Sequence, residues 1–271
     1  MKSFDGWLLM SDLDGTLLSN QKRISMENKE AIKSFVSCGG LFTIASGRTE
    51  LTCRLATDFL PVNAPIVLYN GAAIYDLVSN DFLWTNTLNS EEFIPLLKGI
   101  VHEYETINIQ VFQGGPLLLV NRFGQTDPYI VKENQQYRYA EWENIHPKIF
   151  KIMFRANHGV LLAIEHHLMD WGKDTGVAFE SFFSADYYLE IVPPNCSKGT
   201  CLSWICEYLK IPMTKTLAIG DHANDIDMLR RAKYSAAPEN AIDSVKQVAQ
   251  RVVADCDHHS IHDFLHECGY I

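Results

Sequence analysis

Residues 7–18, WLLMSDLDGTLL, decide the fold that the sequence predicts. Trp7–Met10 is a short apolar run, and the polar Ser11-Asp12 follow it at once. Such a run is typical of a strand buried on both faces in a parallel sheet, because that strand has no polar face. The stretch therefore predicts a buried parallel strand that ends in a polar loop carrying Asp12 and Asp14.

The segments after this loop alternate between the patterns of helices and strands. Residues 25–37 carry an apolar stripe at helical spacing and end at Gly39-Gly40, which is a typical stop for a helix. Residues 41–45 form a second apolar run, and a third run over 66–69 follows another helix that begins near Thr49. This order is typical of a doubly wound parallel sheet, so we predict an α/β, Rossmann-like core.

The pattern changes after residue 84 and returns after residue 190. Between residues 85 and 190, short helical stripes alternate with aromatic-rich runs that have the composition of strands. The earlier alternation then resumes with a helix over 198–209, a strand over 216–219, a helix near 225–232 and a strand near 234–237. We therefore expect residues 1–84 and 191–271 to form one core domain, with residues 85–190 inserted as a second α/β domain.

The composition of the 271-residue chain excludes several classes of protein. It is 47% hydrophobic and 21% charged, which excludes a disordered tail, a collagen-like fibre and a small disulfide-stapled scaffold. A net charge of −10 gives no general attraction to nucleic acid or anionic lipid. The chain has no apolar run of the ~20 residues that a membrane helix needs, and its start does not resemble a secretory signal. We expect a cytoplasmic protein with neither nucleic acid nor membrane as partner.

Two groups of residues invite a redox or metal interpretation. The seven cysteines are scattered without a C-x-x-C pair, and we interpret them as reduced thiols. His258, His262 and His266 would share one face of a helix, because they are spaced by four residues. No H-E-x-x-H motif is present, so an exposed terminal helix is a better interpretation of these histidines than a metal site.

Polar residues follow each predicted core strand directly. The carboxyl ends of parallel strands lie at one edge of a sheet, where ligands bind, so these residues are expected to converge. Lys198 begins a predicted helix, where backbone N–H groups favour an anion. Several carboxylates in one crevice repel one another unless a divalent cation neutralises them, and oxygen ligands favour Mg²⁺. A cation, a lysine and a hydroxyl together suit a phosphoryl group. The residues at the strand ends are Asp12, Asp14, Ser46, Asn70, Asp221, Asn224 and Asp225.

Each of these residues also has a purely structural interpretation. Asp12 and Ser46 could cap a helix or a turn, and Asp14-Gly15 is a common turn pair. Lys198 could be an ordinary solvated lysine, and residues 221–225 could form a solvated acidic turn. Their joint occurrence in this order, each at a strand end or a helix start, favours the functional interpretation.

Four segments resemble the motifs of a known superfamily. They are Asp12-Leu13-Asp14-Gly15-Thr16-Leu17, Ser46-Gly47-Arg48, Ser197-Lys198-Gly199 and Gly220-Asp221-His222-Ala223-Asn224-Asp225. Together they match the haloacid dehalogenase superfamily, and Asn70-Gly71-Ala72 and Ile191-Val192-Pro193 are similar to phrases of its Cof-type sugar-phosphatase branch. The resemblance covers both core segments. The length and position of residues 85–190 suit the large α/β cap of that branch, which would set substrate specificity.

The resemblance implies a role for each site residue. Asp12 would be the nucleophile that forms an aspartyl-phosphate, and Asp14 would be the general acid and base. Mg²⁺ would be held by the side chains of Asp12 and Asp221 and by the main-chain carbonyl of Asp14, while Asp225 would support these ligands. The remaining residues implied are Ser46, Gly47, Lys198 and Asn224 for phosphate binding, with Arg48 and Asn70 as possible substrate contacts.

The function that the resemblance implies is an Mg²⁺-dependent phosphatase acting on small organic phosphate monoesters, with sugar phosphates as the leading class. A phosphomutase on sugar phosphates and a non-catalytic phosphometabolite-binding protein on the same fold remain alternatives. A Rossmann nucleotide-binding enzyme is disfavoured, because no G-x-G-x-x-G follows the first strand. The expected partner is a small phosphorylated metabolite, and the sequence leaves both a monomer and a homodimer open.

Two segments depart from the pattern of that branch. Asn195 and Cys196 precede the motif lysine, where the branch usually has a glycine. Because Asn tolerates a positive φ, we expect the turn to be kept. Residues 257–261, DHHSI, stand where the branch often has Asn and then Gly-Val. This second departure bears on the substrate preference and not on the chemistry.

Overall fold

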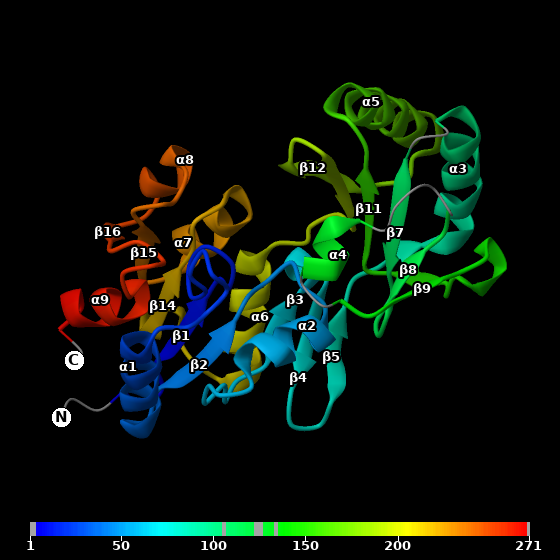
Figure 1. Cartoon of the computed structure of the whole chain (residues 1–271). Coiled ribbons are helices and arrows are strands. Elements are labelled where there is room, and N and C mark those ends of the chain that lie inside the picture. The colour runs from blue at the N-terminus through cyan, green and yellow to red at the C-terminus, as the bar shows by residue number, and fades with distance from the viewer. Residues whose placement is uncertain (1–3, 105–106, 122–126, 133–134, 270–271) are drawn as a thin grey trace. The chain divides into compact units, whose positions relative to one another are not determined.

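The computed structural model describes residues 4–104, 107–121, 127–132 and 135–269 (Figure 1). The chain folds into two compact units. Unit 1 comprises Met1–Gly47, Ala56–Trp84 and Ser197–Ile271, and unit 2 comprises Arg48–Leu55 and Thr85–Cys196. Each unit has a hydrophobic core of its own.

The centre of unit 1 is a parallel sheet, as the sequence predicts. Its neighbouring strands are all paired in parallel, and the inner strand β1 is buried at every position. The strand that precedes Asp12, β1, therefore has a parallel neighbour on each side. The strand order is β16 (Arg251–Val253), β15 (Tyr234–Pro238), β14 (Thr216–Ile219), β1 (Leu8–Ser11) and β2 (Leu41–Ile44).

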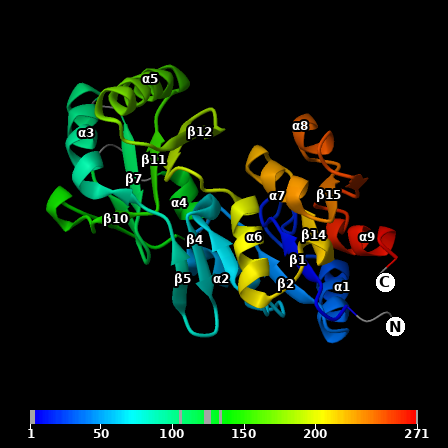
Figure 2. The same ribbon diagram turned by 180° about the vertical axis from the view of Figure 1, so that it is seen from behind.

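Helices lie on both faces of this sheet (Figures 1 and 2). α1 (Met26–Ser37) packs against α9 (Ser260–Glu267), and α6 (Lys198–Leu209) packs against α7 (Ile226–Arg231). Apolar side chains of α6, α7 and α8 (Asp243–Lys246) form one cluster with Leu8 and Met10, which alternate along β1. A parallel sheet covered by helices on both faces is a doubly wound α/β fold, which confirms the predicted fold class.

The third predicted strand has a parallel neighbour, as expected, and also an antiparallel one. Val67 forms a parallel bridge with Ala45, just after β2, and the N–H of Ser46 donates to the carbonyl of Val67 at 2.9 Å. The strand, β3 (Ile66–Leu68), also runs antiparallel to β4 (Ala73–Asp76), in a sheet that contains β5 (Asp81–Thr85). The reason is the tight turn η1 (Tyr69–Gly71), where Asn70 has φ 58°. This turn reverses the chain at once, so the strand pairs with the segment that follows it.

Unit 2 contains a second sheet, in which most neighbours are antiparallel and β8 and β9 are parallel. Two helices, α3 (Ser90–Glu103) and α5 (His158–Thr175), pack their apolar side chains against Ile109, Ile152 and Leu189 on one face of the sheet. The strand order is β12 (Glu180–Ala185), β13 (Tyr188–Val192), β11 (Lys151–Arg155), β7 (Asn108–Phe112), β8 (Leu117–Leu119) and β9 (Tyr137–Tyr139).

The opposite face of this second sheet carries buried polar residues. Lys151 and Glu190 form an ion pair at 3.0 Å. Gln110 and Tyr188 donate hydrogen bonds to the buried carboxylate of Asp127, at 2.8 and 2.7 Å. Side chains alternate along a strand, so these residues lie on the face that α3 and α5 do not cover. Their charges are paired with one another, as buried charges must be.

Two short strands, β6 (Leu88–Asn89) and β10 (Lys148–Ile149), pair with each other in unit 2. The remaining short elements are α2 (Glu50–Thr57), α4 (Pro128–Lys132), η2 (Trp142–Asn144), η3 (Met213–Lys215) and η4 (Ala223–Asp225).

The predicted stripe of three histidines is wrong. α9 begins at Ser260, so His258 precedes the helix, and His259 between them has φ 68°, which is not helical. His262 and His266 do share the helix, and their rings stack with centroids 6.4 Å apart. His258 instead lies 2.7 Å from a carboxylate oxygen of Asp255. The three side chains therefore do not form one helical face.

The turn before α6 and the cysteine side chains can be compared with the sequence predictions. Asn195 has φ 60°, so the turn before α6 is kept without a glycine, as predicted. All seven cysteines carry free thiols. Within the described ranges, no helix combines the length and apolarity that crossing a membrane requires.

Candidate active site

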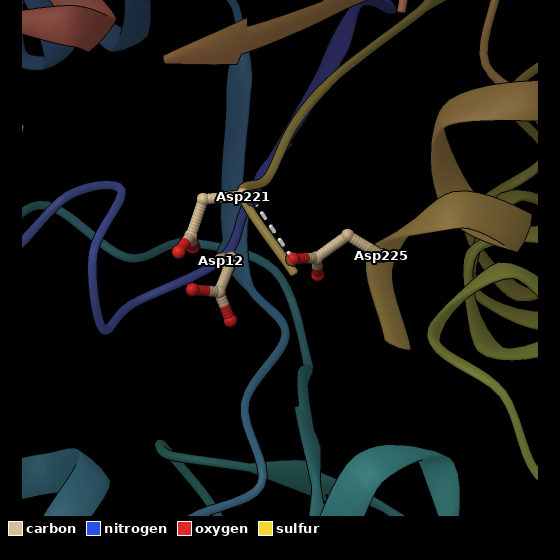
Figure 3. Close-up of side chains that lie close together, drawn as sticks. All are labelled: Asp12, Asp221 and Asp225. Carbon is tan, nitrogen blue, oxygen red and sulfur yellow. Dashed lines mark hydrogen bonds between the residues drawn. The ribbon is translucent and has the colours of Figure 1, made fainter. Parts of the chain in front are cut away.

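The parallel sheet of unit 1 brings together acidic residues that are far apart in the sequence. The N–H of Asp12 donates to the carbonyl of Ile219 at 2.9 Å, so the pairing of β1 with β14 continues to the start of both loops. One carboxylate oxygen each of Asp12, Asp221 and Asp225 lies within 4.8 Å of the other two. Figure 3 shows Asp12 and Asp221 side by side, with Asp225 pointing toward them from the opposite side.

Lys198 is the cation of this cluster. Its Nζ donates to Oδ1 of Asp12 at 2.5 Å and to Oδ1 of Asp225 at 2.6 Å. The side chain of Lys198 is 1% exposed, so the two carboxylates replace the water around its ammonium group. Lys198 begins α6, whose first turn is closed by a capping box of Ser197 and Thr200. Burying the ammonium is tolerated because it is paired on both sides.

Asp225 holds Lys198 and the loop of Asp221 in place through hydrogen bonds. Its Oδ1 accepts from Lys198, and its Oδ2 accepts from the backbone N–H groups of Asp221 and His222, each at 3.0 Å. A Cβ atom at Gly220 would lie 2.4 Å from Cγ of Asp225, so only glycine lets this carboxyl group approach the backbone. Both oxygens of Asp225 are thus engaged in holding Lys198 and the loop that carries Asp221.

Burial and charge shift the pKa values of the cluster. Burial raises the pKa of Asp12 well above its ordinary value, and Lys198 opposes this rise. Burial and the nearby carboxylate of Asp225 also raise the pKa of Asp221. Burial alone would lower the pKa of Lys198, but Asp12 and Asp225 raise it above its usual range. The lysine therefore stays charged, and a second cation beside Asp12 and Asp221 would favour their ionised forms.

Asp14 lies in the loop that follows Asp12, where Gly15 permits a left-handed backbone. Gly15 has φ 78°, and a Cβ atom there would lie 2.5 Å from Oδ2 of Asp221. Thr16 donates to Oδ1 of the same Asp221 at 2.8 Å. The side chain of Asp14 is 31% exposed, whereas that of Asp12 is 9% exposed. The two aspartates of the motif therefore occupy different environments.

Ser46 and two amide side chains complete the strand ends of unit 1. The N–H of Asn70 donates to the carbonyl of Ser46 at 3.1 Å, and Nδ2 of Asn224 donates to Oδ1 of Asn70 at 2.9 Å. A Cβ atom at Gly47 would lie 2.7 Å from that Asn70 oxygen. Oδ1 of Asn224 is buried and accepts no hydrogen bond from the described part of the chain. The site thus contains a buried acceptor that a ligand could satisfy.

The model of the haloacid dehalogenase-like hydrolase family matches residues 9–265. The chain belongs to this family. The membership confirms the superfamily that the four motifs indicate, and the chain is therefore a hydrolase of phosphoric monoesters.

Individual members of the haloacid dehalogenase-like hydrolases align over nearly their whole length. The 5-amino-6-(5-phospho-D-ribitylamino)uracil phosphatase YitU of Bacillus subtilis is 24% identical over 268 residues, which cover 96% of this chain and 97% of the relative. A second Bacillus subtilis phosphatase of the same name, YwtE, is 28% identical over 274 residues and covers 94% and 95%. A haloacid dehalogenase-like hydrolase from Bacteroides thetaiotaomicron has a TM-score of 0.86 at 26% identity and covers 97% and 99%.

Unit 1 of this haloacid dehalogenase-like hydrolase contains all but one of the predicted site residues. The exception is Arg48, which belongs to unit 2, and its contact with a substrate stays a prediction. Asp12, Lys198 and Asp221 lie in or beside the buried cluster, and Asp14 lies at its exposed side. The predicted site residues that lie in unit 1 are Asp12, Asp14, Ser46, Gly47, Asn70, Lys198, Asp221, Asn224 and Asp225.

Three residues of the site escaped the reasoning from sequence. Thr16 orients Asp221, and Asn240 donates from Nδ2 to the carbonyl of Gly15 at 2.8 Å. Lys22 contacts Asp14. Thr16 lies inside the first motif, so its position in the sequence could have marked it as a site residue. Asn240 and Lys22 lie outside the four motifs, and their contacts depend on loop shape.

The donors of this cluster fit a divalent cation. Asp12 and Asp221 supply carboxylate oxygens side by side, and hard cations such as Mg²⁺ prefer oxygen ligands. Burial raises the pKa values of both groups although Lys198 lowers them, and a further cation would oppose that rise. Asp225 is less suited as a direct ligand, because both of its oxygens already accept hydrogen bonds. A cation beside Asp12 and Asp221 would remove the repulsion between them.

Proposed function

We propose that the chain is an Mg²⁺-dependent phosphatase that hydrolyses small organic phosphate monoesters, foremost sugar phosphates, through an aspartyl-phosphate on Asp12. One observation carries the proposal: the buried contact of Lys198 with Asp12. It provides a carboxylate nucleophile and a fixed positive charge where the phosphoryl group would bind.

The first half of the reaction uses Asp12 and Asp14 in different roles. A carboxylate oxygen of Asp12 attacks phosphorus as the bond from phosphorus to the ester oxygen breaks. The electron pair of that bond stays on the ester oxygen, which takes a proton from Asp14. The half-exposed position of Asp14 suits this role, since its carboxyl group can exchange a proton with solvent or with a leaving alcohol. The products are the free alcohol and phosphorylated Asp12.

The second half returns the enzyme to its starting state. Asp14, now ionised, takes a proton from a water molecule whose oxygen attacks the phosphorus of the intermediate. The bond between phosphorus and Asp12 breaks, and inorganic phosphate leaves. Lys198 balances the negative charge on the phosphoryl oxygens in both halves. Ser46, Gly47 and Asn224 would position the phosphoryl group, because they lie at the same strand ends.

Mg²⁺ would be held by the side chains of Asp12 and Asp221 and by the main-chain carbonyl of Asp14. When bound, it neutralises the acidic cluster and polarises a phosphoryl oxygen. Asp225 would act indirectly, by fixing Lys198 and the backbone at residues 221 and 222. Thr16 would orient the carboxylate of Asp221 in the same way.

The substrate class rests on the relatives and on the second domain. The two Bacillus subtilis relatives are named for a substrate with a phosphate on a ribityl chain, which supports a polyol or sugar phosphate here. We assign substrate selection to residues 85–190 as a cap domain, with residues 1–84 and 191–271 as the catalytic core. The compact fold of this inserted segment, with a hydrophobic core of its own, supports its assignment as a separate domain.

Phosphate release tests the proposal directly. The wild type is incubated with p-nitrophenyl phosphate and with a panel of sugar and polyol phosphates, in Mg²⁺ and in chelator. We expect Mg²⁺-dependent release, with the highest kcat/KM on a polyol or sugar phosphate. Isomerised sugar phosphate without free phosphate would indicate a phosphomutase. Tight binding of esters without turnover would indicate a binding protein.

A further inference from the structure

The loop between β1 and α1 carries a lysine that contacts Asp14. Nζ of Lys22 donates to Oδ1 of Asp14 at 2.5 Å. The two side chains are 36% and 31% exposed, so this contact lies outside the buried cluster around Lys198. None of the roles assigned above uses Lys22.

The backbone at Lys22 directs its side chain. Lys22 has φ 58°, in the left-handed region that glycine and asparagine adopt most readily. A turn holds it there: the N–H of Lys22 donates to the carbonyl of Ser19 at 2.8 Å, and the N–H of Ser19 donates to the carbonyl of Arg23 at 2.9 Å. These two hydrogen bonds hold Lys22 in a fixed place in the loop, from which its side chain reaches Asp14.

The same loop is tied to the segment that departs from the family pattern. Asn20 donates twice to the carboxylate of Asp257, from its backbone N–H at 2.9 Å and from Nδ2 at 2.7 Å. The hydroxyl of Ser260 donates to the carbonyl of Thr16 at 2.7 Å. Residues 257 and 260 both lie in the stretch 257–261 that differs from the branch. This stretch therefore braces the loop that presents Lys22 to Asp14.

We propose that Lys22 is a positioning residue that holds the carboxyl group of Asp14 in the orientation needed to protonate the leaving alcohol. A half-exposed aspartate has several rotamers of similar energy, and misorientation of an acid slows proton transfer. The ammonium group of Lys22 is a donor only, so it can bind one oxygen of Asp14 whether or not the other carries the proton. The role rests on the proposed function, since Asp14 acts as acid only in ester cleavage.

The contact contributes little to stability, which separates orientation from folding. Exposed ion pairs are worth about 0–1 kcal/mol, because water replaces a lost partner. Lys22→Asn removes the ammonium and keeps a residue that tolerates a positive φ. Lys210→Asn is the matched control: Lys210 is an exposed lysine with φ 57° at the end of α6. Lys22→Arg keeps the charge and the donor.

The test compares kcat/KM for two leaving groups, because kcat/KM reports the steps up to release of the alcohol. For a sugar phosphate we expect Lys22→Asn to lower kcat/KM about 10-fold, a part of the 10²–10⁴ that general acid catalysis supplies. For p-nitrophenyl phosphate, whose leaving group needs no proton, we expect a loss within about 2-fold. Lys22→Arg should recover most of the loss, and Lys210→Asn should change neither substrate.

A double variant shows whether Lys22 acts through Asp14. In an Asp14→Asn background, adding Lys22→Asn should cause no further loss of kcat/KM on the sugar phosphate. A further loss there, equal losses on both substrates, or no loss on either would overturn the role of Lys22 in an active enzyme. A wild type that releases no phosphate from any ester would contradict the proposed function itself, and the role of Lys22 with it.

Discussion

Two lysine–aspartate contacts in unit 1 have the same length and opposite surroundings. Lys198 meets Asp12 at 2.5 Å with side chains that are 1% and 9% exposed. Lys22 meets Asp14, also at 2.5 Å, with side chains that are 36% and 31% exposed. Water can replace a lost partner in the second pair and not in the first. Although the two contacts are equally short, breaking the buried one should therefore cost far more stability than breaking the exposed one.

The difference matches the two roles proposed for the aspartates. A nucleophile that must stay ionised in a buried site needs a permanent cation beside it, and Lys198 supplies one. An acid that must exchange protons with a leaving group and with water needs access and orientation, and a half-exposed pair supplies both. Two carboxylates only two residues apart can thus work in opposite protonation states.

Removing the buried cation should have the largest effect. In Lys198→Met, Asp12 and Asp225 face each other without their shared partner. We expect kcat/KM to fall about 10²–10³-fold. We also expect the free energy of unfolding to fall by about 3–5 kcal/mol, as measured by denaturant melts. Acidic pH should recover part of this stability, because it protonates the carboxylates. A variant with near wild-type turnover and stability would break the comparison.

Displacing Asp221 without changing any charge should have the next largest effect. The Cβ atom of Gly15→Ala would meet Oδ2 of Asp221 at 2.5 Å, and the residue would be strained at φ 78°. We expect at least a 10-fold weaker apparent affinity for Mg²⁺, following the loss typical of disturbed metal sites. Titration of activity with Mg²⁺ measures it. Gly99→Ala is the control, since nothing lies within 4 Å of a Cβ atom there. Unchanged Mg²⁺ affinity in Gly15→Ala would show that Asp221 is not a ligand.

The pH dependence of stability distinguishes the protein with and without Mg²⁺. Burial raises the pKa values of Asp12 and Asp221, so without metal the folded state binds protons more tightly than the unfolded chain. The stability they contribute is complete below their unfolded pKa of about 4 and is lost as pH rises through the folded values. Mg²⁺ binds the ionised forms, so its contribution to the free energy of unfolding should grow over the same pH interval, to about 2.7 kcal/mol at 100 times Kd, and Tm should rise with it. Thermal melts in Mg²⁺ and in chelator from pH 4 to 8 measure this. A Tm difference that does not depend on pH would argue against the buried pair as ligands.

The exposed pair should give the smallest change in stability. In Lys22→Asn we expect the free energy of unfolding to change by less than about 1 kcal/mol. Denaturant melts of this variant, beside Lys198→Met, measure the contrast between the two pairs. A loss for Lys22→Asn as large as that for Lys198→Met would show that burial does not distinguish them.

The sequence predicts the sheet and most of the cluster, because the residues concerned follow strands. β14 and α6 coincide with the ranges predicted for them. The antiparallel pairing of β3 with β4 was missed, although Asn70-Gly71 is a dipeptide typical of the tight turn that joins two antiparallel strands. The brace between Asn20 and Asp257 could not be predicted, because it joins two loops that only the folded chain brings together.

The central claim is that Asp12 accepts the phosphoryl group, and trapping the intermediate tests it most directly. Turnover mixtures with a sugar phosphate and Mg²⁺ are quenched in acid, and the protein is analysed by intact mass and peptide mapping. The account predicts one phosphoryl group per chain on the peptide containing Asp12, and none in Asp12→Asn, which folds normally and releases no phosphate. Full turnover by Asp12→Asn, or a phosphoryl group on another residue, would contradict it.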